Sequence, residues 1–394
     1  MQNISIKLQK INYSQTLVMS AKTRLLKEKG VDVINLSIGE PDFFPTSKIL
    51  EGAKKSMNQG HHYYTPISGY LELREVTCDK FLRDNSLHYN PSQIVISAGA
   101  KQAIINLFLS LLNPGDNVII PAPFWLSYYE MARFCETKPV IIHPSIFKDL
   151  KITPDQLKEA ITPNTKIFIF SSPCNPSGTI YSYDELKNLS DVLLKHPQLI
   201  IISDEIYEHI NYSEGHISIG SINEVYEQTI TLNGISKAFA MPGWRIGYIG
   251  APEWIAKACE KIQGQMTSGT NSIAQQAAII ALKYHPHRIK YMIETFRKRR
   301  DLVLYMMKGI PGFRSNISDG SFYIFPNVAD IFGNIYLGVK ISSAYDLSQV
   351  LLEKAQLACV NGKPFGEENC LRISYATSEK ILEEAFNRIK RLLS

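Results

Sequence analysis

Several features that mark membrane, secreted or metal-binding proteins are missing from this sequence. No run approaches the roughly 18 consecutive apolar residues that a transmembrane helix needs, and the first 14 residues contain no apolar core of signal-peptide length. The six cysteines are scattered, with no C-x-x-C pair and no spacing typical of a metal site. We therefore expect a cytoplasmic protein with reduced thiols, without a metal site and without a membrane partner.

An excess of charge of one sign is also missing. The chain has 42 Lys and Arg residues against 37 Asp and Glu residues, which gives a formal net charge of +5. Its densest basic cluster, residues 297–300, falls in a helical pattern close to Glu294 and Asp301. We interpret this cluster as a solvated helix face, in preference to a nucleic-acid-binding patch, and expect no nucleic-acid partner.

The length and the apolar pattern indicate the fold class. The 394 residues, 45% of them hydrophobic and 20% charged, are enough for two domains that each bury a core. Near-continuous apolar runs alternate with helical patterns, at residues 93–97, 117–121, 139–143, 166–170 and 199–203. This repetition predicts an α/β fold with a mostly parallel sheet covered by helices on both faces. We expect a large domain at residues 45–285 and a smaller α+β domain formed by residues 1–44 and 286–394.

The stretch 229–250 contains the strongest chemical signal. A β-branched, apolar run typical of a buried strand precedes Ser236 and Lys237. A lysine just after a buried strand loses hydration, which lowers its pKa and frees its amine to attack a carbonyl. Arg245, eight positions later, has the planar fork that suits a phosphate. The cluster suggests pyridoxal phosphate held as a Schiff base, although a surface lysine and a salt-bridged arginine fit the spacing equally well.

The wider motif around this lysine resembles a known family. Read from Ser236 to Tyr248, S-K-x-F-x-x-P-G-x-R-x-G-Y is similar to the lysine signature of the class I and II pyridoxal-phosphate-dependent aminotransferases of fold type I. The resemblance extends from about Tyr13 to the C-terminus and is closest to the prokaryotic aspartate aminotransferases. It implies that Lys237 forms the Schiff base with pyridoxal 5'-phosphate, while Ser236 and Arg245 bind the cofactor phosphate.

Two further segments match cofactor-binding positions of the family. Gly99, Ala100 and Lys101 lie between a predicted strand and a predicted helix, where backbone N–H groups and the helix dipole can hold an anion. Such junctions are common in α/β proteins, but the resemblance implies that these three residues form the phosphate-binding loop. Trp125 follows the run 117–121 and, by the same resemblance, stacks on the pyridine ring beside the substrate.

Polar residues that follow the next two apolar runs also match the family. Asn175 begins an N-P-S-G motif and matches the residue that bonds the cofactor's phenolic oxygen and the substrate carboxylate. Asp204 follows a buried run, where a carboxylate needs a cationic partner such as a protonated pyridine nitrogen. Taken alone, Asp204 could equally cap a helix. The resemblance implies that it pairs with the ring nitrogen and that Tyr207 bonds the phenolic oxygen.

The candidate substrate-binding residues come from both ends of the chain. Arg372 is flanked by apolar residues in a strand pattern and needs an anion; by resemblance it binds the substrate α-carboxylate in a bidentate pair. Gly39 follows the strand-like run 31–38 and matches the glycine that lies against this carboxylate. Tyr64 matches the tyrosine that reaches the cofactor phosphate of the neighbouring subunit, which implies a homodimer with shared active sites.

The resemblance implies an aminotransferase that moves the amino group of an L-amino acid, here aspartate, to the 2-oxo acid 2-oxoglutarate, with Lys237 as the general base. A dicarboxylic substrate needs a second cation, and in the prokaryotic branch a lysine after the phosphate loop provides it, together with hydroxyls of the N-terminal arm. Lys101, Ser14 and Thr16 match those positions, although Lys101 could merely occupy a helix start.

Three alternatives use the same residues differently. An aromatic amino acid or prephenate aminotransferase would share the cofactor site, and a pyridoxal-phosphate-dependent lyase would differ only in how the substrate is oriented. A ligand-sensing domain would be non-catalytic, and it would require a DNA-binding segment ahead of the motifs, which begin near residue 13.

Overall fold

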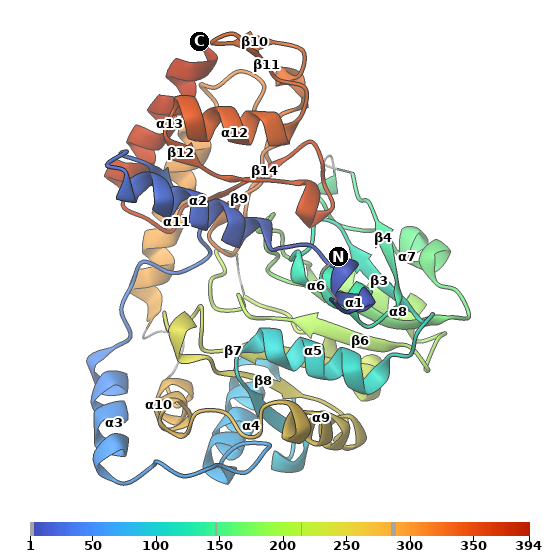
Figure 1. Cartoon of the computed structure of the whole chain (residues 1–394). Helices are drawn as coiled ribbons and strands as arrows, with labels where there is room; N and C mark the ends of the chain where they lie inside the picture. The colour runs from blue at the N-terminus through green and yellow to red at the C-terminus, as the bar shows by residue number, and fades with distance from the viewer. Residues whose placement is uncertain (1–3, 146–147, 214, 285–288) are drawn as a thin grey trace.

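The computed structural model (Figure 1) describes residues 4–145, 148–213, 215–284 and 289–394. Its centre is a seven-stranded sheet in the order β2-β8-β7-β6-β5-β3-β4. The strands are β2 Ile94–Ser97, β3 Asn117–Pro121, β4 Lys138–Ile142, β5 Thr165–Ser171, β6 Ile200–Asp204, β7 Thr229–Gly234 and β8 Gly247–Gly250. Within this sheet β8 alone runs against its neighbours, so the predicted α/β class and mostly parallel sheet are confirmed.

Helices make up much of the remaining chain. Up to residue 284 they are α1 Ile6–Gln9, α2 Gln15–Glu28, α3 Ser47–Asn58, α4 Leu71–Asn85, α5 Ala100–Leu111, α6 Ser127–Phe134, α7 Pro154–Ala160, α8 Tyr183–Leu193, α9 Glu253–Met266 and α10 Ser272–Leu282. After residue 288 they are α11 Lys290–Met307, α12 Ala344–Lys354 and α13 Glu379–Leu393. Among the described residues, none of the helices is both long enough and apolar enough to span a membrane.

The strands of the central sheet bury side chains on both faces. Ile169 and Ile202 pack on one face, in a core that includes residues of α5, α6 and α9. Phe168 and Ile201, one position earlier in each strand, pack on the other face with residues of α7 and α8. A strand that is covered on both sides has to be apolar at every position, which explains the near-continuous apolar runs in the sequence.

The C-terminal elements gather in a second part of the molecule, uppermost in Figure 1. Its strands are short: β9 Tyr323–Ile324, β13 Val360–Asn361 and β14 Leu371–Ser374 form one sheet, β10 Ile335–Tyr336 and β11 Val339–Lys340 form a hairpin, and β12 Leu357–Ala358 pairs with β1 Ile34–Asn35. Residues of α11, α12 and α13 complete their core. The predicted boundary at residues 285–286 lies outside the described residues, and the proposed division into two domains stays a prediction.

The structure corrects two local predictions. The strand predicted at residues 31–38 is reduced to β1, at Ile34–Asn35. The basic cluster of α11 is only half solvated, since Arg297 and Lys298 are exposed but Arg299 and Arg300 are 6% and 9% exposed. Arg299 Nη1 lies 2.7 Å from Asp42 Oδ1, and its Nε lies 3.3 Å from Glu379 Oε1. Carboxylates from distant parts of the chain therefore compensate the buried charge.

Candidate active site

The predicted site residues gather at one edge of the central sheet. The parallel strands β3, β5, β6 and β7 end at this edge, and their carboxyl ends lead into the segments that carry Trp125, Asn175, Asp204 and Lys237. A cavity of about 590 Å³ opens there, and all the predicted site residues except Gly99 and Tyr64 line it, namely Ser14, Thr16, Gly39, Ala100, Lys101, Trp125, Asn175, Asp204, Tyr207, Ser236, Lys237, Arg245 and Arg372.

Lys237 lines this cavity, and the pKa of its amine is lowered. Its Nζ donates a hydrogen bond of 2.5 Å to the carbonyl oxygen of Gly39. Burial lowers the pKa of Lys237 to about 8, with the nearby cations Arg372 and Arg245 acting in the same direction and Glu40 opposing them. Far more of the amine is therefore neutral near pH 7 than in an exposed lysine, and the neutral form is the one that attacks a carbonyl.

Asp204 lies at the floor of the cavity, at the last position of β6. Its Oδ2 accepts a 2.5 Å hydrogen bond from the hydroxyl of Tyr128, and its Oδ1 accepts one from the backbone N–H of Ile206. Burial raises the pKa of Asp204 to about 6, and these two donors limit the rise. A buried carboxylate that faces a cavity in this way is suited to a cationic group of a ligand.

Tyr207 and Tyr323 form a hydroxyl pair on the cavity wall, with their oxygens 3.1 Å apart. Burial raises the pKa of Tyr207 well above its ordinary value, so its hydroxyl keeps its proton and can donate it to an acceptor. The hydroxyl of Tyr323 also limits position 39, because a β-carbon on Gly39 would collide with it. A larger residue at this position would therefore displace the Tyr323 hydroxyl.

Arg372 is a buried cation with spare donors. Its Nη2 donates to the carbonyl oxygen of Ser37 at 2.7 Å and to Thr16 Oγ1 at 3.3 Å, and its Nη1 donates to Asn175 Oδ1 at 3.2 Å. Its Nε has no hydrogen-bond partner although it is buried. No carboxylate of the described residues pairs with this guanidinium, so the site is suited to a carboxylate from a ligand.

The start of α5 and Arg245 form a positive corner of the site. The first N–H groups of α5 have no partner within the helix, and the helix dipole adds partial positive charge at this end. Gly99 adopts φ +87°, and a β-carbon there would collide with the guanidinium of Arg245, which places the two groups side by side. Arg245 donates to the carbonyl oxygens of Pro242 and Ala98, at 2.7 and 3.2 Å, and lies within reach of the cavity.

Lys101 lies at the opposite side of this corner, over the ring of Trp125. Its Nζ is 4.9 Å from the ring centroid. Partial burial and the charge of Arg245 lower the pKa of Lys101. Ser14 and Thr16, from the segment that begins α2, line the same cavity. The structure thus places Lys101 and the two hydroxyl residues of the N-terminal segment in one cavity, and their role in substrate binding stays a prediction.

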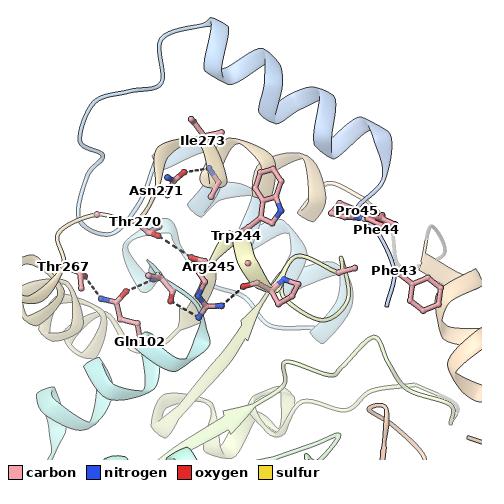
Figure 2. A pocket seen from close by; sticks show the side chains of 16 residues that line it. Phe43, Phe44, Pro45, Gln102, Trp244, Arg245, Thr267, Thr270, Asn271 and Ile273 are labelled. Atoms are coloured by element: carbon pink, nitrogen blue, oxygen red, sulfur yellow. Dashed lines mark hydrogen bonds between the residues drawn. The ribbon is translucent and has the colours of Figure 1, made fainter. Parts of the chain in front are cut away.

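Tyr64 is separate from these residues. Its side chain is 97% exposed and does not line the cavity. A second hollow of about 730 Å³ opens beside Arg245 (Figure 2), and shares Pro242, Gly243 and Arg245 with the cavity. Phe44, which also lines this hollow, is 91% exposed. In the single chain, Arg245 can therefore be reached from the surface through this hollow.

Tyr128 and Tyr323 are site residues that the sequence did not reveal. Tyr128 lies one helical turn after Trp125, and the two rings contact each other edge to face. Tyr323 packs against the guanidinium of Arg372, whose central carbon is 4.7 Å from the ring centroid. For Tyr128, the only local signal of a place in the site was its spacing from Trp125. Tyr323 would ordinarily be interpreted as a buried strand residue.

Three comparisons relate the chain to known proteins. The family model for aminotransferase class I and II matches residues 31–389. The chain is 43% identical over 387 residues to a protein of Rhizobium leguminosarum bv. phaseoli named probable aspartate/prephenate aminotransferase, which covers 98% of this chain and 97% of that protein. Its structure matches the aspartate aminotransferase from Rhizobium meliloti with a TM-score of 0.96 at 37% identity, over 100% of this chain and 99% of that chain. It also matches the aspartate aminotransferase from Thermus thermophilus with maleate, with a TM-score of 0.94 at 36% identity over 100% of both chains.

Proposed function

The chain belongs to the class I and II aminotransferases, and we propose that it transfers the amino group of L-aspartate to 2-oxoglutarate with pyridoxal 5'-phosphate as cofactor. The observation that carries this proposal is the arrangement of three charged groups around one cavity. The partly buried amine of Lys237, the buried carboxyl of Asp204 and the buried guanidinium of Arg372 all line it. Among the residues that the structure describes, none forms a salt bridge with any of the three groups, and a cofactor with its substrate would provide partners for all of them.

The residues of the cavity fit this cofactor group by group. Arg245, Ser236 and the backbone N–H groups at Ala100 and Lys101 would hold its phosphate at the positive corner. Asp204 has a raised pKa because it is buried without a cation, and a protonated ring nitrogen would remove that cost. The three roles inferred from the resemblance, stacking by Trp125 and hydrogen bonding by Asn175 and Tyr207, are consistent with their places in the cavity.

The chain's own residues would carry the proton transfers. Bound pyridoxal phosphate supplies an electron-withdrawing ring that acidifies the α-carbon of the substrate. Arg372 would fix the substrate through its α-carboxylate, using the donors that now contact Asn175 and Ser37. Lys237 Nζ, once free, would take the α-proton and return it at a neighbouring carbon, because burial keeps its pKa near neutrality.

Lys101 supports a dicarboxylic substrate. It is a cation at the start of α5, where it opposes the helix dipole, and it lines the cavity with Ser14 and Thr16. These groups would bind the side-chain carboxylate while Arg372 binds the α-carboxylate. The relative from Thermus thermophilus, solved with the dicarboxylate maleate, is in keeping with this proposal. Prephenate is a second candidate substrate, favoured by the name of the relative from Rhizobium leguminosarum.

We propose that the active enzyme is a homodimer in the cytoplasm. The hollow beside Arg245 (Figure 2) gives a second copy access to the phosphate corner, and Tyr64 of the partner subunit is the residue proposed to enter it. The exposed Tyr64 and Phe44 side chains are apolar surface that a partner would cover. The six cysteines are all unpaired, which is in keeping with a reducing compartment.

A half-reaction tests the proposed function. The enzyme would be loaded with pyridoxal phosphate and mixed with L-aspartate in the absence of any oxo acid. We expect its visible absorbance to change to that of the amino form of the cofactor, with stoichiometric release of oxaloacetate. Lys237→Ala, loaded in the same way, should bind the cofactor without this conversion. If neither aspartate nor glutamate converts the cofactor to its amino form, the assignment of dicarboxylic substrates is overturned. Conversion by the amino acid that corresponds to prephenate would support the second candidate.

A further inference from the structure

A network of buried ionisable groups lies directly behind the end of β6, outside the active-site cavity. Glu205 and Glu208 are 1% and 4% exposed, and Lys80 and Asn85 of α4 are 1% and 3% exposed. Lys80 forms an ion pair with Glu208, and its Nζ also donates to Asn85 Oδ1 at 2.7 Å. None of these groups has a role in the proposed reaction, although burying so many charges is costly.

The network alternates along the chain with the residues of the site. Asp204 and Tyr207 line the active-site cavity, whereas the side chains that directly follow each of them, Glu205 and Glu208, belong to the network. The last backbone bond from this segment to the sheet runs from the N–H of Glu205 to the carbonyl oxygen of Leu232 in β7, at 2.9 Å, and the residues that follow form turns. Beyond this bond, the orientation of the segment depends on what fixes the side chains of Glu205 and Glu208.

Asn85 joins these two carboxylates. Its Nδ2 donates to Glu205 Oε2 at 2.9 Å and to Glu208 Oε2 at 2.7 Å. Glu205 is held further by Ser218 Oγ at 2.6 Å and by Nε2 of His216 at 2.8 Å. Every carboxylate oxygen of the pair thus faces a hydrogen-bond donor, which favours a network of fixed geometry over a cation site.

We propose that Asn85, Glu205 and Glu208 are positioning residues that aim Asp204 and Tyr207 into the active site. The network fixes the carboxylates of Glu205 and Glu208. Because Asp204 and Tyr207 each directly precede one of these residues, the same contacts restrict the side chains that face the cavity. The inference rests on the proposed function, in which Asp204 pairs with the ring nitrogen and Tyr207 donates to the phenolic oxygen. A donor to that oxygen stabilises its anionic form, so a displaced Tyr207 would raise the pH at which the bound cofactor changes its absorbance.

The first test replaces Asn85 with leucine, which has a similar volume and no hydrogen-bonding groups. The pH titration of the visible absorbance would be recorded for the holoenzyme without substrate. We expect the midpoint of Asn85→Leu to rise by about half a unit or more, and kcat to fall by about tenfold with less change in KM. The control is Asn117→Leu, because Asn117, at the start of β3 and away from the site, is also buried and donates a hydrogen bond to Thr162.

A second pair of variants separates positioning from stability. Glu208→Leu leaves Lys80 as an unpaired buried cation and should destabilise the fold. Lys80→Met combined with Glu208→Leu removes both charges and should restore the melting temperature. We expect the absorbance midpoint of the double variant to stay shifted, because the bond between Asn85 and position 208 is still missing.

The outcomes are separable. A midpoint that returns to the wild-type value together with stability would overturn the positioning role and leave a structural one. The same holds if Asn85→Leu and Asn117→Leu lower stability equally and neither shifts the midpoint. A wild-type protein that takes up pyridoxal phosphate without any pH-dependent visible band would instead refute the proposed function itself.

Discussion

The hydroxyl of Tyr128 donates a 2.5 Å hydrogen bond to Oδ2 of Asp204, and both side chains are buried. This bond opposes the burial that raises the pKa of Asp204 to about 6. We expect Tyr128→Phe to raise this pKa further, so that the carboxyl group loses its charge at a higher pH. In the pH profile of kcat/KM for aspartate, the acid limb should then move to higher pH by about one pH unit.

Tyr181→Phe is the matched control for this prediction. The hydroxyl of Tyr181 is also buried, but it accepts a hydrogen bond from the backbone N–H of Ile152, away from Asp204. Its removal should leave the acid limb in place. If the two variants give the same pH profile, Tyr128 does not support the charge of Asp204.

Asp204→Asn should affect the apoenzyme and the holoenzyme in opposite directions. The pKa of Asp204 is raised from 3.8 to about 6 in the folded apoenzyme, so the folded state binds the proton more tightly and its stability falls as the pH rises across that window. The variant removes this cost, and the apoenzyme should gain up to roughly 3 kcal/mol at pH 7 in urea unfolding. The kcat of the loaded variant should fall by about a hundredfold, on the order of 3 kcal/mol. A less stable apoenzyme with near-normal kcat would contradict both expectations.

The lowered pKa of Lys237 predicts a pH dependence of cofactor uptake. Burial lowers this pKa from 10.5 to about 8, so the amine loses its proton in a range where an exposed lysine stays charged. The initial rate at which the apoenzyme binds pyridoxal phosphate covalently should therefore rise with pH and level off above about 8. Stopped-flow absorbance can measure this rate, with Lys237→Met as the blank. A rate that continues to rise towards pH 10 would indicate a solvated amine.

The same shift predicts how the stability of the apoenzyme depends on pH. Because the folded state releases the proton of Lys237 at a lower pH than the unfolded state, this residue adds stability as the pH rises from about 8 to about 10.5. Lys237→Met should therefore be more stable than the unsubstituted apoenzyme below pH 8, and the difference should shrink at alkaline pH. Urea unfolding of both proteins at pH 7 and pH 10 checks this expectation.

Lys101→Ala tests the choice of substrate. Removing one partner of a desolvated charge pair costs about 2–5 kcal/mol, so kcat/KM for aspartate should fall by at least about thirtyfold. The values for alanine and phenylalanine should fall much less, because they have no second carboxylate. Lys257→Ala, which removes an exposed lysine of α9, should change none of the three. Equal losses on all three substrates in Lys101→Ala would assign Lys101 to the cofactor instead.

The part of the site that the sequence predicts lies in contiguous motifs. Lys237, Asn175 and Asp204 each follow an apolar run, and the carboxyl ends of parallel strands meet at one edge of a sheet. Once the runs were identified as strands, their convergence followed from the fold class. The strands predicted for the central sheet differ from the observed ones by at most one residue at each end, which is within the usual uncertainty of boundaries.

The remaining features depend on contacts between distant segments, which leave no local signal. Tyr128 meets Asp204 across 76 residues, and Tyr207 meets Tyr323 across 116 residues. The burial of Arg299 was missed for the same reason, because its partner Asp42 is 257 residues away. A charged helical pattern indicates a solvated face unless such partners are known, and only the packed structure supplies them.

The assignment of Lys237 as the residue that carries the cofactor can be tested directly. The enzyme would be loaded with pyridoxal phosphate, reduced with borohydride to fix the cofactor to its lysine, digested and mapped by mass spectrometry. We expect the label on the peptide that contains Lys237, and we expect Lys237→Ala to remain folded and unlabelled there. A label confined to another lysine of the wild-type protein would contradict the central assignment.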